Sequence, residues 1–359
     1  TIDPKDIVST RNLLHEAIPI TGTIVSGTYG ENNIKNYTHG MFQSVYDYPF
    51  LSSSANHIID LTAGYPAASA LSASTNNQNA KKINIYNEMA QVLAGFDQDG
   101  NVRRFDKDGN FGTTGDEINE AFFFNFTRLL AKDEIKKGSF SITLGVDDAY
   151  LTPFAKSITI TDASGSNGFK VNSPAGEYGI LFAKDGTGTP MGGGSMVTYG
   201  MPCGLLFYQA GIAVVTASVF SDISSNKGLL TTACEMGAPD WAGEAGLINA
   251  VLTGSGISGS CDDLRHRLQN ISFNNTTELN STIYFCRASH NDFNYSSNPT
   301  YLSASKMVVK NNSTDSPVSY TTAVGLYSAD NELLAVAKLS EPLKKDPSSE
   351  FTLRVRLDY

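Results

Sequence analysis

The 359-residue sequence is poor in several residue types on which particular functions depend. Charged residues make up 17% of the chain, below the roughly 25% of an average globular protein. The 26 Lys and Arg are outnumbered by 36 Asp and Glu, and the net charge of −10 argues against a protein that coats nucleic acid. No stretch reaches the roughly 18 uncharged apolar residues of a membrane helix, and the first residues do not resemble a signal segment.

Cysteine is also scarce, and its spacing excludes the usual metal motifs. Four cysteines, Cys203, Cys234, Cys261 and Cys286, occur without a Cys-x-x-Cys pair, which disfavours structural zinc. Their number leaves two disulfides open. Because no signal segment is visible, we expect reduced thiols that are buried as small hydrophobic side chains.

Hydrophobic residues, at 41%, are sufficient for a core, and the N-terminal third carries two helical patterns. Apolar residues at steps of three and four predict a helix over 83–95, which should stop near Gly95. A second helix is predicted over 116–133, starting at acidic residues and deeply buried through Phe122–Phe124. We expect these helices to pack as a pair.

The rest of the chain is predicted to be mostly β. Alternating or β-branched runs predict strands at 139–144, 158–161, 178–183, 204–208, 212–215, 281–287, 306–310, 320–327, 333–339 and 351–359. The expected fold is α+β and predominantly β, with antiparallel β-sandwich-like sheets. We expect an N-terminal region 1–138 and a β-rich region 139–359, or a single interleaved domain. The Gly-rich segments 186–194 and 254–259 are expected to be long loops that are either mobile or ordered by a neighbouring subunit.

Two elements near the C-terminus allow finer predictions. A hairpin over 320–339 should turn at Ala329–Asn331. Its residues expected on or near a buried face are Val324, Leu326, Leu334, Val336 and Leu339, and those expected toward solvent are Lys338, Glu341, Lys344 and Lys345. The final strand should place Phe351, Leu353, Val355 and Leu357 on one face and pair with this hairpin.

Two acidic turns at Asp97–Asn101 and Asp106–Asn110 are near-copies of each other. Alternating carboxylates at this spacing can converge on calcium, but the EF-hand glycine is replaced by Val102 and Phe111. Asp-Gly-Asn is also favourable turn chemistry, so we expect Asp97–Asn110 to form two tight turns without a metal, separated by a short strand at Val102–Phe105.

A Gly-x-Gly-x-x-Gly sequence at Gly254–Gly259 matches the dinucleotide fingerprint by its letters. It lies between a possible strand at Leu247–Leu252 and a possible helix at Asp262–Leu268. The chain lacks the alternation of strands and helices that a dinucleotide fold requires, so we assign no cofactor.

Signals for catalysis are equally weak. The five histidines, His15, His39, His57, His266 and His290, are scattered, although any of them could be a general base. Glu235 and Asp240 flank the only tryptophan, Trp241, a pattern that could serve glycan hydrolysis. We predict that the protein is not an enzyme, and we assign no catalytic, cofactor-binding or metal-binding residues.

The C-terminal segments Tyr320–Tyr327, Asn331–Lys345 and Leu353–Tyr359 carry a resemblance to a known group of proteins. Together with Lys132–Phe140 and Gly204–Val214, they resemble virion structural proteins of tailed bacteriophages, particularly long contractile-tailed ones. The resemblance implies a structural subunit of a virion, in the tail baseplate or at a fibre junction.

Alternatives are a capsid-associated or neck protein and, in another class, a virion-associated glycan hydrolase. The expected partners are other virion proteins and copies of this chain, with no membrane and no direct nucleic-acid contact. Assembly is expected in the host bacterial cytoplasm.

Overall fold

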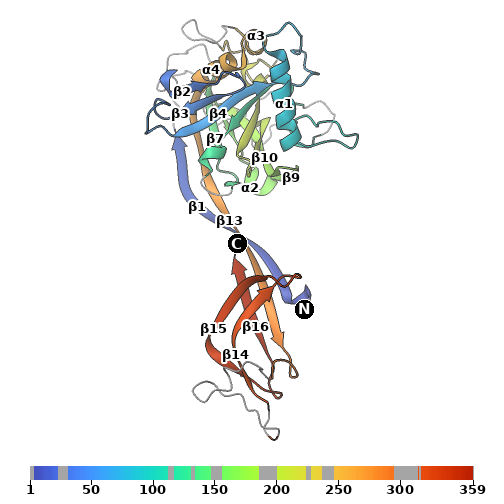
Figure 1. Ribbon diagram of the computed structural model, residues 1–359. Helices are drawn as coiled ribbons and strands as arrows, with labels where there is room; N and C mark the ends of the chain where they lie inside the picture. Colours follow the sequence, from blue (N-terminus) through green and yellow to red (C-terminus); the bar gives the residue numbers. More distant parts are fainter. Residues whose placement is uncertain are drawn as a thin grey trace. The chain divides into compact units, whose positions relative to one another are not determined.

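The chain divides into two compact units (Figure 1). Unit 1 consists of Thr1–Leu13 and Glu278–Tyr359, and unit 2 of Leu14–Thr277. This division differs from the boundary near residue 138 considered from the sequence. The computed structural model describes residues 4–22, 31–111, 117–130, 134–146, 156–185, 200–223, 228–236, 246–294, 314 and 317–358.

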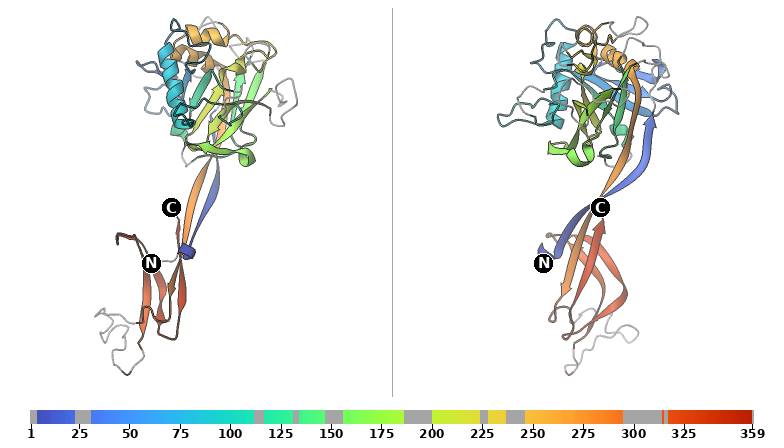
Figure 2. Two further views of the ribbon diagram at one scale, coloured as in Figure 1. Left: turned by 90° about the vertical axis from the view of Figure 1, so that its right-hand side faces the viewer. Right: turned by 180° about the vertical axis from the view of Figure 1, so that it is seen from behind.

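Unit 2 is built on a large sheet in which every pairing with a described register is antiparallel (Figures 1 and 2). Its strand order is β1-β13-β7-β8-β10-β11-β12-β5-β4-β3-β2, with β6 also beside β13 and β9 beside β10. The strands are β1 (Ile7–Gly22), β2 (Ile34–Asn36), β3 (Gln43–Tyr46), β4 (His57–Gly64), β5 (Ala121–Asn125), β6 (Glu134–Ile135), β7 (Ser141–Gly145), β8 (Ser157–Thr161), β9 (Lys170–Ser173), β10 (Gly176–Asp185), β11 (Met201–Phe207), β12 (Ile212–Thr216) and β13 (Leu268–Ala288). The predominantly β class expected from the sequence is therefore confirmed.

The helices are few and mostly short. They are α1 (Asn79–Leu93), α2 (Gly165–Gly168), α3 (Ile248–Gly254) and α4 (Ile257–Arg267), with 3₁₀ turns η1 (Pro4–Asp6), η2 (Glu31–Asn33), η3 (Thr127–Leu129) and η4 (Ala217–Phe220). The helix predicted over 83–95 is confirmed as α1, which starts four residues earlier and ends just before Gly95, whose φ is 79°. α1 lies close to β4 because Gly64 has no side chain: a Cβ there would meet the Lys82 carbonyl at 2.6 Å.

The second predicted helix, over 116–133, is wrong. Residues 121–125 form strand β5, and only the single turn η3 follows it within the described residues. β5 pairs with β4 on one side and with β12 on the other, and its three phenylalanines are fully buried. Phe123 packs against Tyr86 of α1, whereas Phe122 packs against Phe220 of η4, so both faces of the strand are covered. A strand buried on both faces has the continuous apolar run that we interpreted as a buried helix.

Most strand predictions in unit 2 are confirmed, including β11 and β12, which the structure joins as a hairpin that turns at Tyr208–Gly211. Val102–Phe105 is not a strand, since only Val102 makes an isolated bridge, to Phe96. The segment Leu247–Leu252 belongs largely to α3 rather than to a strand. Gly254–Gly259 is not a long loop, because it spans the end of α3 and the start of α4. The segments 186–194 and 306–310 lie outside the described residues.

Unit 1 contains β14 (Ser319–Tyr327), β15 (Leu333–Lys345), β16 (Phe351–Asp358) and the second half of β13. The predicted hairpin is confirmed: β14 and β15 pair as a two-stranded sheet and turn at Asn331, whose φ is 63°. The predicted C-terminal strand is also confirmed, and Val355 is buried between the exposed Arg354 and Arg356. Its expected partner was wrong, because β16 pairs with β13 from Ser281↔Asp358 to Ala288↔Phe351.

Candidate functional site

A polar cluster connects neighbouring strands at one side of the unit 2 sheet. His57 and Asp60 lie on β4, and Ser44 lies opposite Asp60 on β3. Nε2 of His57 is 2.6 Å from Oδ1 of Asp60, and the Ser44 hydroxyl donates a short hydrogen bond to the same oxygen. Burial alone would raise the pKa of Asp60, but the hydrogen bonds from His57 and Ser44 outweigh it and hold this pKa below its ordinary value.

The order of these three groups does not suit nucleophilic catalysis. In a catalytic triad the histidine lies between the hydroxyl and the carboxylate, so that it can take the hydroxyl proton. Here Asp60 lies between Ser44 and His57, and Ser44 is fully buried. The cluster therefore links β3 to β4 through the hydrogen bonds that Asp60 accepts, and we call it the Asp60 cluster. Sequence reasoning singled out His57 but missed Asp60 and Ser44, because only the β3–β4 register brings them together.

The other predicted site residues lie on separate elements. His39 stacks on Tyr37, His266 of α4 is hydrogen-bonded to the Asp262 carbonyl at 2.7 Å, and His290 of unit 1 pairs with Glu350. Glu235 is described, but Asp240 and Trp241 lie outside the described residues, as does the side chain of His15. The carboxylate pair on which a hydrolase interpretation depends therefore lies only partly within the described residues.

The two acidic segments at Asp97–Asn110 form turns, as predicted. Gly100 and Gly109 take positive φ values of 81° and 69°. One oxygen of Asp97 accepts hydrogen bonds from the backbone amides of Asp99 and Asn101, at 2.9 and 2.8 Å. These bonds, led by that from Asn101, lower the pKa of Asp97. Its carboxylate thus stabilises its own turn.

At the Gly-x-Gly-x-x-Gly segment, a side chain of the same chain bonds the first amide of the following helix. The amide of Ile257, the first residue of α4, donates to Oε1 of Gln78 at 3.0 Å. A glycine-rich phosphate site uses free amides at that position, and here the Gln78 side chain occupies the first of them.

All four cysteines are free thiols, and Cys203, Cys234 and Cys261 are buried as predicted, whereas Cys286 is half-buried. Burial raises the pKa of Cys203 to about 12, so this thiol is a poor nucleophile and metal ligand at neutral pH. Within the described residues, no group of three or more His, Cys, Asp or Glu side chains could hold a metal ion. Nor does any helix of the described chain reach the length and apolarity needed to span a membrane.

The strongest functional feature is a contrast between the two units. Of the 56 buried hydrophobic residues among those described, 53 lie in unit 2 and three in unit 1, namely Ala288, Leu326 and Val355. In the part of the chain that the structure describes, 16 large hydrophobic side chains are exposed, and eight of these lie in the smaller unit 1. Unit 1 therefore leaves apolar surface in water that a self-sufficient domain would bury.

Four of these exposed side chains gather on the β14–β15 hairpin. Tyr327, Leu333, Leu334 and Val336 are 62%, 53%, 67% and 54% exposed, and we call them the hairpin patch. Gly325 lies opposite Val336, and a Cβ on it would come within 3.0 Å of the Tyr327 ring and 3.4 Å of Leu333. The ring thus covers the glycine and stands on the same face as Val336.

The hairpin patch overturns part of the sequence prediction. Leu326 is buried as expected, but Leu334 and Val336 are exposed. The pairing register shifts between Leu326 and Tyr327, which makes Leu334 the extra residue of a bulge. Because side chains alternate along a strand, Val336 lies on the opposite face of β15 from Ala335 and Ala337. Apolar character in this hairpin therefore does not by itself predict burial.

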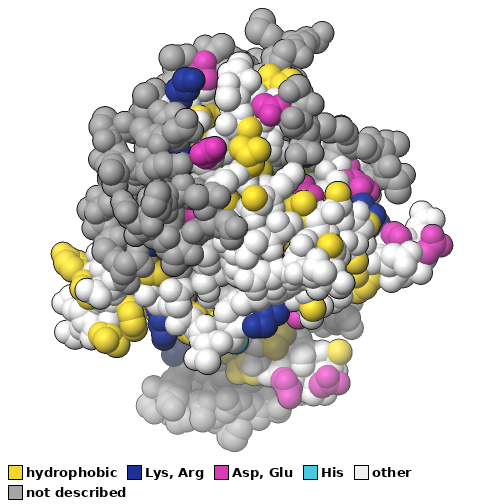
Figure 3. Space-filling model, turned by 90° about the horizontal axis from the view of Figure 1, so that it is seen from above, with side chains coloured by type: hydrophobic (Ala, Val, Ile, Leu, Met, Phe, Trp, Pro, Cys, Tyr) yellow, Lys and Arg dark blue, Asp and Glu magenta, His cyan; other side chains and the backbone are white. Residues whose placement is uncertain are grey.

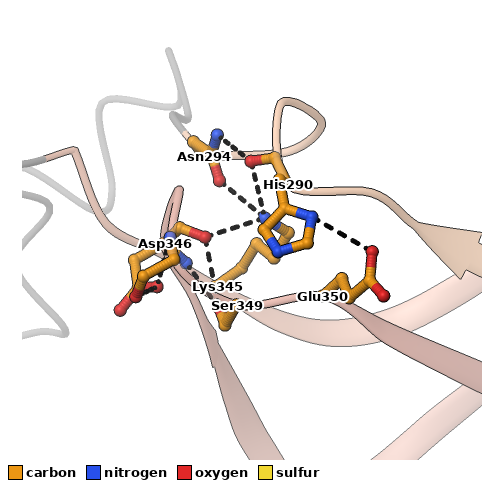
Figure 4. A network of polar contacts seen from close by, with 7 residues as sticks. His290, Asn294, Lys345, Asp346, Ser349 and Glu350 are labelled. Atoms are coloured by element: carbon orange, nitrogen blue, oxygen red, sulfur yellow. Dashed lines mark hydrogen bonds and ion pairs between the residues drawn. The ribbon is translucent and has the colours of Figure 1, made fainter.

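A buried lysine secures the other end of the hairpin (Figure 4). Lys345 was expected toward solvent, but it is fully buried. Its Nζ donates to the carbonyls of His290 and Asp346 at 3.1 and 2.9 Å, and to Oδ1 of Asn294 at 2.8 Å. His290 also pairs with Glu350 at 3.1 Å. This network ties the end of β15 to the segment that follows β13, which holds the hairpin in place within unit 1.

Comparisons of the chain with protein-family models, with curated proteins and with solved structures find no match. A functional proposal for this protein is therefore carried by its own residues.

Proposed function

We propose that this chain is a structural subunit of a larger particle, which works by holding neighbouring proteins rather than by chemical turnover. The observation that supports this most directly is the contrast between a well-packed unit 2 and unit 1, whose described residues include three buried hydrophobic side chains and eight large exposed ones. Exposed apolar surface of this kind is typical of a protein that is completed by its neighbours.

The resemblance of the C-terminal segments to virion proteins of tailed bacteriophages supports a virion as the particle, and we propose the tail baseplate or a fibre junction as the location. That resemblance includes Tyr320–Tyr327 and Asn331–Lys345, the strands that bear the hairpin patch. Two of the segments that resemble virion proteins thus also carry the exposed hairpin patch. The buried Lys345 network supports the same function, because a contact surface needs a fixed backbone beneath it.

The test is the protein composition of purified particles. Phage particles encoding this chain would be purified on a density gradient and analysed by quantitative mass spectrometry, with a phage replication protein as the negative control. We expect this chain at several copies per particle. Its absence from particles that contain the other tail proteins would contradict the proposal.

A further inference from the structure

Unit 1 differs from unit 2 in charge as well as in packing. Its segments 1–13 and 278–359 contain 10 Lys and Arg against 11 Asp and Glu, a net charge of −1. The chain as a whole carries −10, so unit 2 carries the remaining −9. Two copies that approach through unit 2 repel each other, whereas two that approach through unit 1 do not.

The hairpin patch shows the same neutrality on a smaller scale. β14, with the sequence Ser-Tyr-Thr-Thr-Ala-Val-Gly-Leu-Tyr, has no charged residue and no proline. Charges and prolines are the usual protection of a strand against association with another chain. β15 carries such residues only from Lys338 onward, beyond the patch. The turn between the strands adds the exposed Asp330 and Glu332 at one edge of the patch, while the four patch side chains themselves are uncharged. An apolar face is the fitting complement of those four side chains.

We propose that the hairpin patch is covered by the hairpin patch of a second copy of this chain, in a two-fold contact. This inference rests on the proposed structural function and names the partner. A two-fold contact brings the same surface together from both copies, and apolar side chains can pack against their own copies in this way. The two-fold axis must then pass nearer to Val336 than to the turn, so that Asp330 and Glu332 of the two copies stay apart. On the described part of the upper face of unit 2, by contrast, hydrophobic side chains occur in separate small groups among polar ones (Figure 3).

The test uses sedimentation velocity of the full chain between about 1 and 100 µM, with Val336→Glu as the variant. The matched control is Leu51→Glu, because Leu51 is 88% exposed and lies in unit 2. We expect the wild-type chain to dimerise and Val336→Glu to raise the dimer Kd at least tenfold, since a carboxylate would be buried against an apolar face. Leu51→Glu should leave the Kd unchanged. Both substitutions are at exposed positions, and circular dichroism would verify that the variants fold.

A charge pair makes the two-fold geometry testable. Val336→Glu and Val336→Lys should each dimerise weakly alone, and a mixture should recover at least part of the lost affinity, because residue 336 of each copy faces the same patch of the other. A wild-type chain that is monomeric at 100 µM, or a Val336→Glu Kd equal to that of the wild type, would overturn the inference. If such a monomer is still found in purified particles, the self-contact fails and the structural function stands. If the wild-type chain dimerises through the patch but is absent from purified particles, the self-contact stands and the structural function fails.

Discussion

Lys82 of α1 is predicted to be a stabilising residue of unit 2, and its replacement by methionine tests this. Its ammonium group is fully buried and donates to three backbone carbonyls, those of Asn77, Leu252 and Ser255, at 3.0, 2.6 and 2.7 Å. Two of these carbonyls lie at the C-terminal end of α3, where helical carbonyls have no intrahelical partner. One lysine thus joins α1 to the junction of α3 and α4.

The magnitude follows from two opposing contributions. Hydrogen bonds from a charged donor contribute about 1.5–3 kcal/mol each to stability. Burial lowers the pKa of Lys82 from 10.5 to about 8, which corresponds to a cost of about 3 kcal/mol for keeping the ammonium charged. Methionine has a similar length but no donor, so it removes all three bonds and also the cost of the buried charge. We expect Lys82→Met to lower the free energy of unfolding by about 2–5 kcal/mol at pH 7.

The assay is urea unfolding followed by far-UV circular dichroism, with Lys81→Met as the control. Lys81 is the neighbouring residue on α1, and its ammonium makes one solvent-exposed bond, to the His39 carbonyl at 2.7 Å. That substitution should cost less than about 1 kcal/mol. If Lys82→Met costs no more than Lys81→Met, the three carbonyls do not depend on the ammonium and the reasoning is refuted.

Three further predictions concern other parts of the chain. Gly179→Ala should destabilise the protein by about 1–3 kcal/mol in urea unfolding, because a Cβ there would overlap the Tyr208 hydroxyl. The control Gly168→Ala introduces a Cβ that meets only ordinary contacts and should cost less. Equal losses of stability in the two variants would contradict this prediction. The pKa of Asp60 is below its ordinary 3.8, so its ionised form stabilises the folded state above that pH, and this contribution is lost as pH falls through the lowered pKa. The difference in free energy of unfolding between the wild type and Asp60→Asn, measured in urea, should therefore be smaller at pH 3 than at pH 6. An equal difference at the two pH values would show that the Asp60 cluster does not stabilise the fold through its ionised carboxylate. Deletion of 351–359 removes β16 from the edge of β13 and should give insoluble protein, and a soluble truncation with unchanged circular dichroism would show that the strand is dispensable.

The sequence predicted those elements in which buried side chains recur at the regular spacing of a helix or of a strand. α1 buries Ile85, Tyr86, Ala90 and Leu93 at helical spacing, and a single face in contact with the sheet produces that pattern. β16 alternates strictly because only one of its faces is covered. The β14–β15 hairpin was found through its turn residues, which act within a few positions of each other.

The errors have a common origin in contacts between distant segments. The sequence of β5 predicts a buried helix because α1 and η4 cover both faces of this strand, and neither covering element can be inferred from the run of phenylalanines itself. The partner of β16 was wrong because an alternating strand can pair with any available edge, and the sequence contains no signal that selects β13. The sequence does not predict the contact between Ser44 and Asp60, because only the register of β3 and β4 places them together.

By itself, the sequence determined the β-rich class, the acidic balance, the C-terminal strand and the hairpin, because each depends on composition or on local periodicity. Only the tertiary structure decided which apolar residues are core and which are surface. Leu326 and Val336 are both apolar residues of the same hairpin, yet one is buried and the other is exposed. The difference depends on which face of each strand another segment covers, and that is a property of the whole packed chain rather than of any local stretch.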